Sequence, residues 1–193
     1  MKKIIISMMV ALLIFGIPKT AFAESKKLPI TQYTQETGYY CGPAALKSAL
    51  STVGRGTWYT QGTLASWLGT TSRDGSSGTR IAQELTNLAG KGWYAATFPS
   101  SYYRDVNDLW TRARGSIKYQ SRPMVAGVYG AFPGFTSPDT RHFVTIYGFS
   151  GTTASNMTYY YADPAGGRNH NIKYGEIKAD RLAYFIADGS IIW

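Results

Sequence analysis

The sequence predicts an α+β domain in which N-terminal helices pack on a C-terminal antiparallel sheet. In the first half of the chain, apolar residues recur at spacings of three and four, which is the period of an amphipathic helix. In the second half, short β-branched and aromatic runs are bounded by turn residues, as strands are. Because helices come first and strands second, we expect the two sets to form two packed layers.

An export signal is predicted at residues 1–23. Two lysines precede an apolar run over residues 4–17, and the small residues of AFA at 21–23 are typical of a cleavage site. The apolar run is shorter than the ~20 residues of a membrane-spanning helix, so a membrane anchor is the less favoured alternative. We therefore expect a secreted protein that is cleaved after Ala23.

The chain after this cleavage site is predicted to be a short leader and one domain. Residues 24–29, ESKKLP, are polar and are expected to form a flexible leader. Residues 30–193 are enough for one domain with its own hydrophobic core, and aromatic residues make up 15% of the sequence. With one cysteine in the chain, this core cannot depend on an internal disulfide.

Four helices are expected in the first half, each from apolar residues that share one face. The expected inward faces are Leu46, Ala49, Leu50 and Val53; Leu64, Trp67 and Leu68; Ile81, Leu85 and Leu88; and Val106, Leu109, Trp110 and Ala113. Gly54 is the expected stop of the first helix and Thr60 the cap of the second. The fourth helix spans about 105–117, and residues 72–78, SRDGSSG, are predicted to form a loop.

Five strands are expected in the second half, where the chain is rich in β-branched and aromatic residues between turns. They are residues 123–130, 142–149, 156–163, 182–187 and 190–193. The second and third of these follow one another closely enough to pair as a hairpin.

Charge gives little information about partners. Cleavage after Ala23 removes three lysines, so the formal net charge falls from +9 to +6. This charge favours solubility or attraction to an anionic polymer such as a cell wall, and the scattered basic residues favour the first interpretation. We expect no nucleic-acid partner, no membrane contact after signal cleavage, and no cofactor. No metal site is predicted, because one cysteine and two histidines lack ligand spacing.

Cys41 is the most informative single residue. An unpaired cysteine in an exported chain is a buried apolar residue, an intermolecular bridge or a reactive thiol. Gly42 and Pro43 follow it directly and begin the first predicted helix, since proline is favoured in the first helical turn. The positive end of that helix would stabilise a thiolate, which favours the reactive thiol.

A reactive thiolate needs a base and a group that orients the base. Of the two histidines, His142 opens a predicted strand and His170 lies in the polar stretch GGRNHN. A strand can fix an imidazole by packing, so His142 is the predicted base and His170 is interpreted as an ordinary exposed loop histidine. If the hairpin forms, Asp163 lies beside His142, although an Asp-Pro turn is the alternative reason for it. Gln35 is a candidate donor to an oxyanion.

Together these residues resemble the papain-like cysteine peptidases, and more narrowly the bacteriocin-processing (double-glycine) peptidase group and its free-standing secreted relatives. The resemblance is carried by Gln35, by CGPA at 41–44, by His142 opening an apolar strand and by Asp163-Pro164 after the next strand. It implies a papain-like fold, a catalytic triad of Cys41, His142 and Asp163, and an oxyanion hole that Gln35 completes.

The function expected from the resemblance is hydrolysis of peptide bonds in a peptide or protein substrate. Two alternatives remain: a peptidoglycan amidase, endopeptidase or glutamine-modifying toxin with the same thiol chemistry, and an inactive papain-like binding module. The sequence does not indicate which substrate is cleaved, or the oligomeric state.

Overall fold

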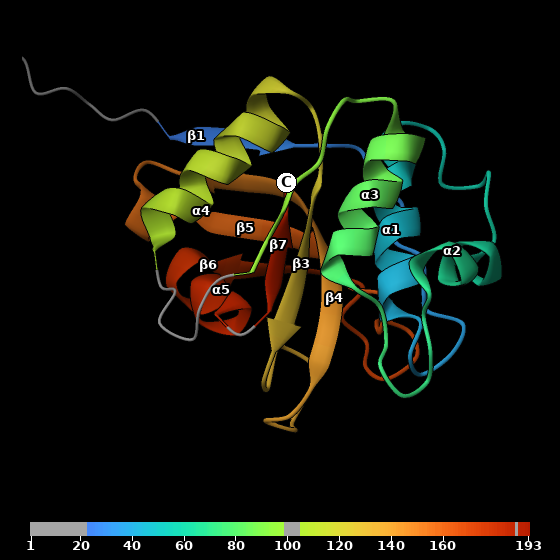
Figure 1. The fold of residues 1–193 in the computed structure, drawn as a ribbon. Helices are drawn as coiled ribbons and strands as arrows, with labels where there is room; N and C mark the ends of the chain where they lie inside the picture. Colours follow the sequence, from blue (N-terminus) through green and yellow to red (C-terminus); the bar gives the residue numbers. More distant parts are fainter. Residues whose placement is uncertain (1–22, 99–104, 188) are drawn as a thin grey trace, which may run out of the picture.

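An antiparallel sheet forms the centre of the computed structural model, which describes residues 23–98, 105–187 and 189–193 (Figure 1). The strand order in this part of the chain is β2-β7-β3-β4-β5-β6, and β1 pairs with the far end of β4. The strands are β1 (Glu24–Lys27), β2 (Ala96–Thr97), β3 (Met124–Tyr129), β4 (Arg141–Gly151), β5 (Thr158–Ala162), β6 (Tyr174–Lys178) and β7 (Ser190–Ile192). All the strand pairs are antiparallel, as predicted.

The helices divide into two groups around the sheet (Figure 1). They are α1 (Cys41–Ser51), α2 (Gln61–Leu68), α3 (Gly78–Ala89), α4 (Val106–Ala113) and α5 (Ala179–Ile186), with a π-helical turn η1 (Arg114–Tyr119) after α4 and a 3₁₀ turn η2 (Ala154–Asn156). One hydrophobic core joins α1, α2 and α3 to the sheet through Val125 and Ile192. A larger core lies among α4, α5 and the other apolar residues of the strands.

Strand β4 belongs to both cores because its side chains alternate. Val144 and Ile146 pack in the larger core, and Phe143 packs against the core of α1, α2 and α3. A bulge between Ile146 and Gly148 shifts the register with β5, so that Phe149 enters the larger core in place of an even-numbered residue.

The four helices predicted in the first half are confirmed, with one error in a buried face. Thr60 caps α2 by accepting a hydrogen bond from the backbone N–H of Thr63 at 3.0 Å, as its position before the apolar run predicts. Trp67 was expected to face inward, but it is 40% exposed. Its ring instead packs edge-on against Tyr59 at a centroid distance of 5.3 Å, at the surface.

The strand predicted at 182–187 is wrong, because these residues belong to helix α5. A short apolar run fits a strand and a buried helix equally well by periodicity alone. The burial pattern is helical, since Leu182, Ala183 and Ile186 are buried and Tyr184 is half exposed. Asp180 lies in the first turn of the helix, where a negative charge is favourable.

The flexible leader predicted at 24–29 is also corrected, because Glu24–Lys27 form strand β1. This strand pairs with β4 from Gly148 to Gly151. Glu24 makes ion pairs with Arg114 at 2.9 Å and Lys118 at 3.1 Å, and these contacts join β1 to η1. The signal peptide predicted at 1–23 lies outside the described residues, apart from Ala23.

No helix within the described ranges has both the length and the apolar character needed to cross a bilayer.

Candidate active site

Cys41 is the first residue of α1, so it lies at the N-terminus of a helix, as the sequence predicts. The N–H groups of a first helical turn have no partner within the helix, and they favour an anion beside them. Burial raises the pKa of the Cys41 thiol, but the hydrogen bond and charge of His142 and the backbone N–H groups of Phe143 and Gly42 together lower it below its ordinary value. The site therefore favours the thiolate.

The glycine after Cys41 is required by packing. A Cβ atom at Gly42 would lie 2.2 Å from the Oγ atom of Ser76, which belongs to the loop predicted at 72–78. Thr70 holds this serine through a hydrogen bond of 2.7 Å between the two hydroxyl groups. The loop can therefore lie directly on the start of α1, where it forms one side of the site.

His142 lies near the start of β4, and its side chain is 4% exposed. Burial lowers the pKa of His142, but hydrogen bonds with Asp163 and Cys41 and the charges of these groups raise it to about 9. Three residues further along β4, the Thr145 hydroxyl donates to the carbonyl oxygen of Ala45 in α1 at 2.9 Å. This buried hydrogen bond ties the strand of His142 to the helix of Cys41.

Asp163 is fully buried directly after β5, and it binds the imidazole of His142. The Oδ1 atom of Asp163 lies 2.7 Å from Nε2 of His142, which leaves Nδ1 as the nitrogen available to Cys41. The same oxygen accepts from the backbone N–H of Ala165 at 2.8 Å. Asp163 therefore both initiates the Asp-Pro turn and contacts His142. The two interpretations of this residue from the sequence, a turn residue and a partner of His142, are compatible.

His170 was interpreted as an exposed loop histidine, and this is wrong. Its side chain is 9% exposed, and its Nε2 atom lies 3.5 Å from Oδ2 of Asp163. The ring of Phe135 packs against both imidazoles, with centroid distances of 4.9 Å to His142 and 5.1 Å to His170. The polar composition of GGRNHN gave no signal for this burial, which depends on the turn between β5 and β6.

Gln35 is buried between the Asp163 turn and the turn before α1. Its backbone N–H donates to the carbonyl of Pro164 at 2.8 Å. One hydrogen of its Nε2 group goes to the carbonyl of Thr37 at 2.9 Å, and its Oε1 atom is buried with no hydrogen-bond partner among the described residues. The structure brings Cys41, His142 and Asp163 together directly, whereas the Gln35 side chain turns toward the loop before Cys41.

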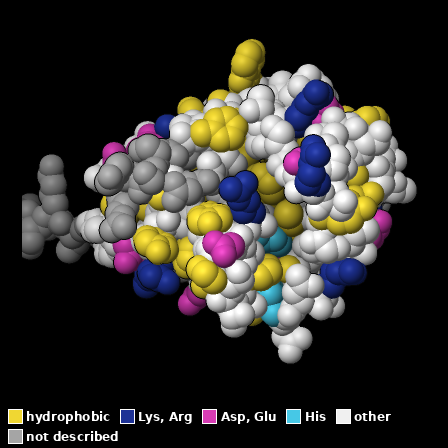
Figure 2. Space-filling view, turned by 60° about the horizontal axis from the view of Figure 1, so that its bottom comes forward, with side chains coloured by type: hydrophobic (Ala, Val, Ile, Leu, Met, Phe, Trp, Pro, Cys, Tyr) yellow, Lys and Arg dark blue, Asp and Glu magenta, His cyan; other side chains and the backbone are white. Residues whose placement is uncertain are grey.

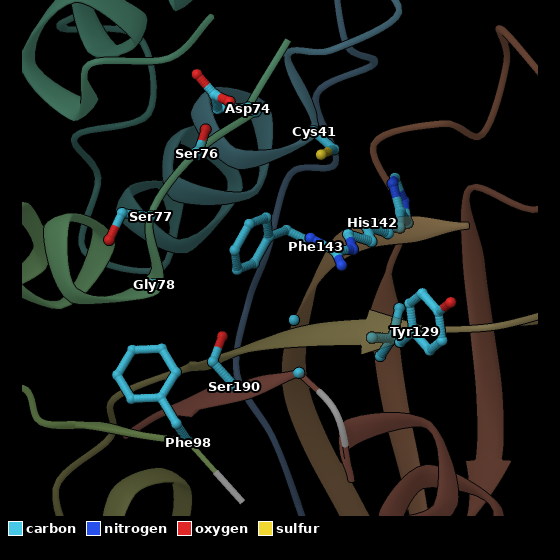
Figure 3. A pocket seen from close by; sticks show the side chains of 15 residues that line it. Cys41, Asp74, Ser76, Ser77, Gly78, Phe98, Tyr129, His142, Phe143 and Ser190 are labelled. Atoms are coloured by element: carbon cyan, nitrogen blue, oxygen red, sulfur yellow. The ribbon is translucent and has the colours of Figure 1, made fainter. Parts of the chain in front are cut away.

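An open cleft ends at Cys41 and His142 (Figure 3). One wall is segment 74–78, which ends at the first residue of α3, together with Phe98, and the other comes from β3 and β4 with Tyr129 and Phe143. In the space-filling view, histidine side chains lie in a hollow of the surface, with hydrophobic and charged side chains around it (Figure 2). The sequence did not predict segment 74–78 as a wall of the cleft, because its composition indicates a loop and not what the loop contacts.

The fold is shared with known cysteine peptidases of low sequence identity. A double-glycine motif protease from an AMS/PCAT transporter, solved with its leader peptide, has a TM-score of 0.54 at 16% identity over 86% of this chain and 91% of that chain. Bromelain from Ananas comosus in complex with E64 has a TM-score of 0.54 at 10% identity, over 85% of this chain and 93% of that chain. The proform of the ragweed pollen protease Amb a 11 has a TM-score of 0.56 at 11% identity, over 88% of this chain and 64% of that chain.

These matches confirm the papain-like α+β fold and the resemblance to the double-glycine peptidases. No curated protein sequence matches the chain. The sequence model described as "Peptidase_C39 like family" matches residues 27–189, which include Cys41, His142 and Asp163. The chain therefore belongs to the Peptidase_C39-like family of cysteine peptidases.

Proposed function

We propose that this protein is a secreted cysteine peptidase with Cys41 as nucleophile, His142 as base and acid, and Asp163 as the residue that orients His142. The observation that carries the proposal is the unbroken series of contacts from Cys41 through His142 to Asp163 at the end of an open cleft. Membership in a family of cysteine peptidases supports the same reaction.

The proposed reaction uses the ion pair between the Cys41 thiolate and the His142 imidazolium. The sulfur attacks the carbonyl carbon of the scissile bond, and the carbonyl π electrons move to oxygen. When this oxyanion collapses, the C–N bond breaks, His142 gives its proton to the leaving amine, and a thioester remains on Cys41. His142 then removes a proton from water, the resulting hydroxide attacks the thioester, and the acid product leaves as Cys41 regains its thiolate.

Gln35 is proposed to stabilise the oxyanion through the second hydrogen of its Nε2 group, since Thr37 accepts only one. The backbone N–H of Cys41, in the first turn of α1, is the other proposed donor. We expect Gln35→Ala to lower kcat by about 10²- to 10³-fold with little change in KM, as removal of one oxyanion donor does. Steady-state kinetics on a cleaved peptide test this, and an unchanged kcat would show that Gln35 only braces the turn at Thr37.

Activity is expected to follow a bell-shaped pH profile, because both members of the ion pair must keep their charge. The acid limb lies below the ordinary thiol range, since the pKa of Cys41 is lowered. The alkaline limb lies at about 9, where His142 loses its proton. The dependence of kcat/KM on pH reports both groups in the free enzyme. A profile that rises only above pH 8, as for an unassisted thiol, would contradict the ion pair.

A peptide substrate fits the cleft better than an anionic cell-wall polymer. Apart from His142, the charged side chains that line the cleft among the described residues are Asp74 and Arg141, one of each sign. The lining of the cleft therefore has no excess of positive charge that would favour a polyanion there. The double-glycine motif protease with the same fold was solved with a peptide bound, which is consistent with a peptide as the substrate class.

The test is a digest of a peptide library by the protein without residues 1–23, read by mass spectrometry, with Cys41→Ala as the matched control. We expect defined cleavage products that are absent with the control. Purified cell walls are digested in parallel, and release of muropeptides with no peptide cleavage would replace the proposal by a wall hydrolase. No product from either substrate would favour a binding module.

Secretion is tested separately. We expect expression of the full chain to yield protein in the medium whose N-terminal residue is Glu24. Retention of residues 1–23 on the exported protein would contradict cleavage after Ala23.

A further inference from the structure

Asp163 lies between two imidazoles, and only one of them has a role in the proposed reaction. Its Oδ1 atom has two hydrogen-bond donors, the imidazole of His142 and the backbone N–H of Ala165. Its Oδ2 atom is buried and has no hydrogen-bond partner in the described part of the chain, and the Nε2 atom of His170 lies 3.5 Å away. That Nε2 atom is likewise buried and without a partner among the described residues. A buried carboxylate oxygen without a donor is costly, and a proton on the Nε2 atom of His170 would offset this cost.

The other nitrogen of His170 determines which tautomer faces Asp163. Nδ1 of His170 accepts a hydrogen bond from the backbone N–H of Ile172 at 3.2 Å. Because an accepting nitrogen carries no proton, the ring proton lies on Nε2, the nitrogen that is 3.5 Å from Oδ2 of Asp163. This tautomer makes Nε2 the donor nitrogen of His170 and keeps Nδ1 as the acceptor of the Ile172 N–H.

The surrounding chain leaves the His170 ring little freedom. The backbone N–H of Gly167 donates to the carbonyl of His170 at 2.6 Å, within the turn between β5 and β6. On the other side, Gly134 has a φ of +98°, and a Cβ atom there would lie 2.4 Å from the ring. Phe135, the next residue, packs edge-on against the same ring. The ring is therefore confined by the backbone at Gly134 and by the ring of Phe135.

We propose that His170 is a positioning residue for the peptidase reaction: its Nε2–H holds Oδ2 of Asp163, so that Oδ1 stays directed at Nε2 of His142. The inference rests on the proposed function, and it adds a fourth member to the series of contacts that begins at Cys41. His170 touches neither the substrate nor the reacting atoms in this arrangement, and it acts through Asp163.

Two substitutions separate the donor from the bulk of the side chain. His170→Leu keeps an apolar body against Phe135 and removes the N–H, whereas His170→Gln keeps an amide N–H near the position of Nε2. We expect His170→Leu to lower kcat by about 10- to 100-fold with little change in KM, the scale of losing an outer hydrogen-bond partner of a functional histidine. His170→Gln is expected to restore most of this loss. Equal losses in both variants would overturn the proposal.

A double-mutant cycle with Asp163→Ala distinguishes positioning from a general structural role. If His170 acts through Asp163, His170→Leu costs nothing further once the carboxylate is gone. A merely structural role would lower kcat by the same factor in both backgrounds, which would overturn the proposal. Thermal melts of all four proteins show that the compared variants are folded.

Alkylation of Cys41 by iodoacetamide tests the same inference without a peptide substrate. If Asp163 is held poorly, it stabilises the His142 imidazolium less, and the pKa of Cys41 rises. A rise of one pH unit in this pKa slows alkylation about tenfold at pH values below the pKa. We expect this slowing in His170→Leu and not in His170→Gln. Wild-type protein that alkylates rapidly at acid pH but cleaves no peptide would sink the proposed function alone. Identical alkylation of wild type and His170→Leu would sink the role of His170 alone.

Discussion

Replacing His142 with alanine is expected to lower kcat for peptide hydrolysis by about 10⁴- to 10⁶-fold, the range found when the base of a triad is removed. Two effects combine in this loss. Without the imidazolium, burial of Cys41 is no longer outweighed, so its pKa rises and the thiolate fraction at neutral pH becomes small. The leaving amine also loses its proton donor, because His142 is the titratable side chain that hydrogen-bonds to Cys41.

Single-turnover and steady-state kinetics with a peptide from the library digest measure this loss. Cys41→Ala gives the background rate, and a thermal melt confirms that the His142→Ala protein is folded. Iodoacetamide is expected to modify Cys41 of this variant only at alkaline pH. A variant that retains a tenth of the wild-type rate would show that another group acts as the base, and His170→Ala would then be compared with it.

Asp163→Ala is expected to lower kcat by about 10⁴-fold, as loss of the orienting carboxylate does in a triad. The substitution leaves the Nε2–H of His142 and the N–H of Ala165 buried without their shared acceptor. It also removes a negative charge that raises the pKa of His142, so the alkaline limb of kcat/KM should move below about 9.

Asp163→Asn is the matched variant for this prediction. It retains an acceptor oxygen in place of Oδ1 and removes the charge, so a smaller loss than in Asp163→Ala measures what the hydrogen bond alone contributes. The pH profile of each variant is recorded over the whole range where the protein is folded. An alkaline limb that stays at about 9 in Asp163→Ala would refute the assignment of His142 as the group that titrates there.

The elements that carry the site were predictable because their signals are local. Gly42 and Pro43 mark the start of α1, so the position of Cys41 at a helix N-terminus follows from three adjacent residues. The hairpin of β4 and β5 follows from two aromatic and β-branched runs with a short connection, and its pairing places Asp163 near His142.

The features that the sequence did not predict depend on contacts between distant segments. The periodicity of residues 182–187 does not distinguish a helix from a strand, because burial on one side of α5 is decided by the larger core. Strand β1 is polar, and it is ordered by its pairing with β4 and by the ion pairs of Glu24. His170 becomes buried only when the turn after Asp163 folds back against Phe135. Each of these outcomes requires tertiary structure that a periodicity argument does not contain.

The hydrogen bond between Thr145 and Ala45 has a consequence for how the protein loses activity on heating. Cys41 belongs to helix α1 and His142 to strand β4, and this buried hydrogen bond links the helix to the strand. If α1 loosens against β4 on heating, the separation between the Cys41 sulfur and the His142 imidazole changes, and proton transfer is sensitive to such small displacements. Thermal inactivation is therefore expected at a lower temperature than the loss of helical circular dichroism, and activity is expected to recover on cooling. Turnover would then detect a displacement of α1 against the sheet before the protein unfolds.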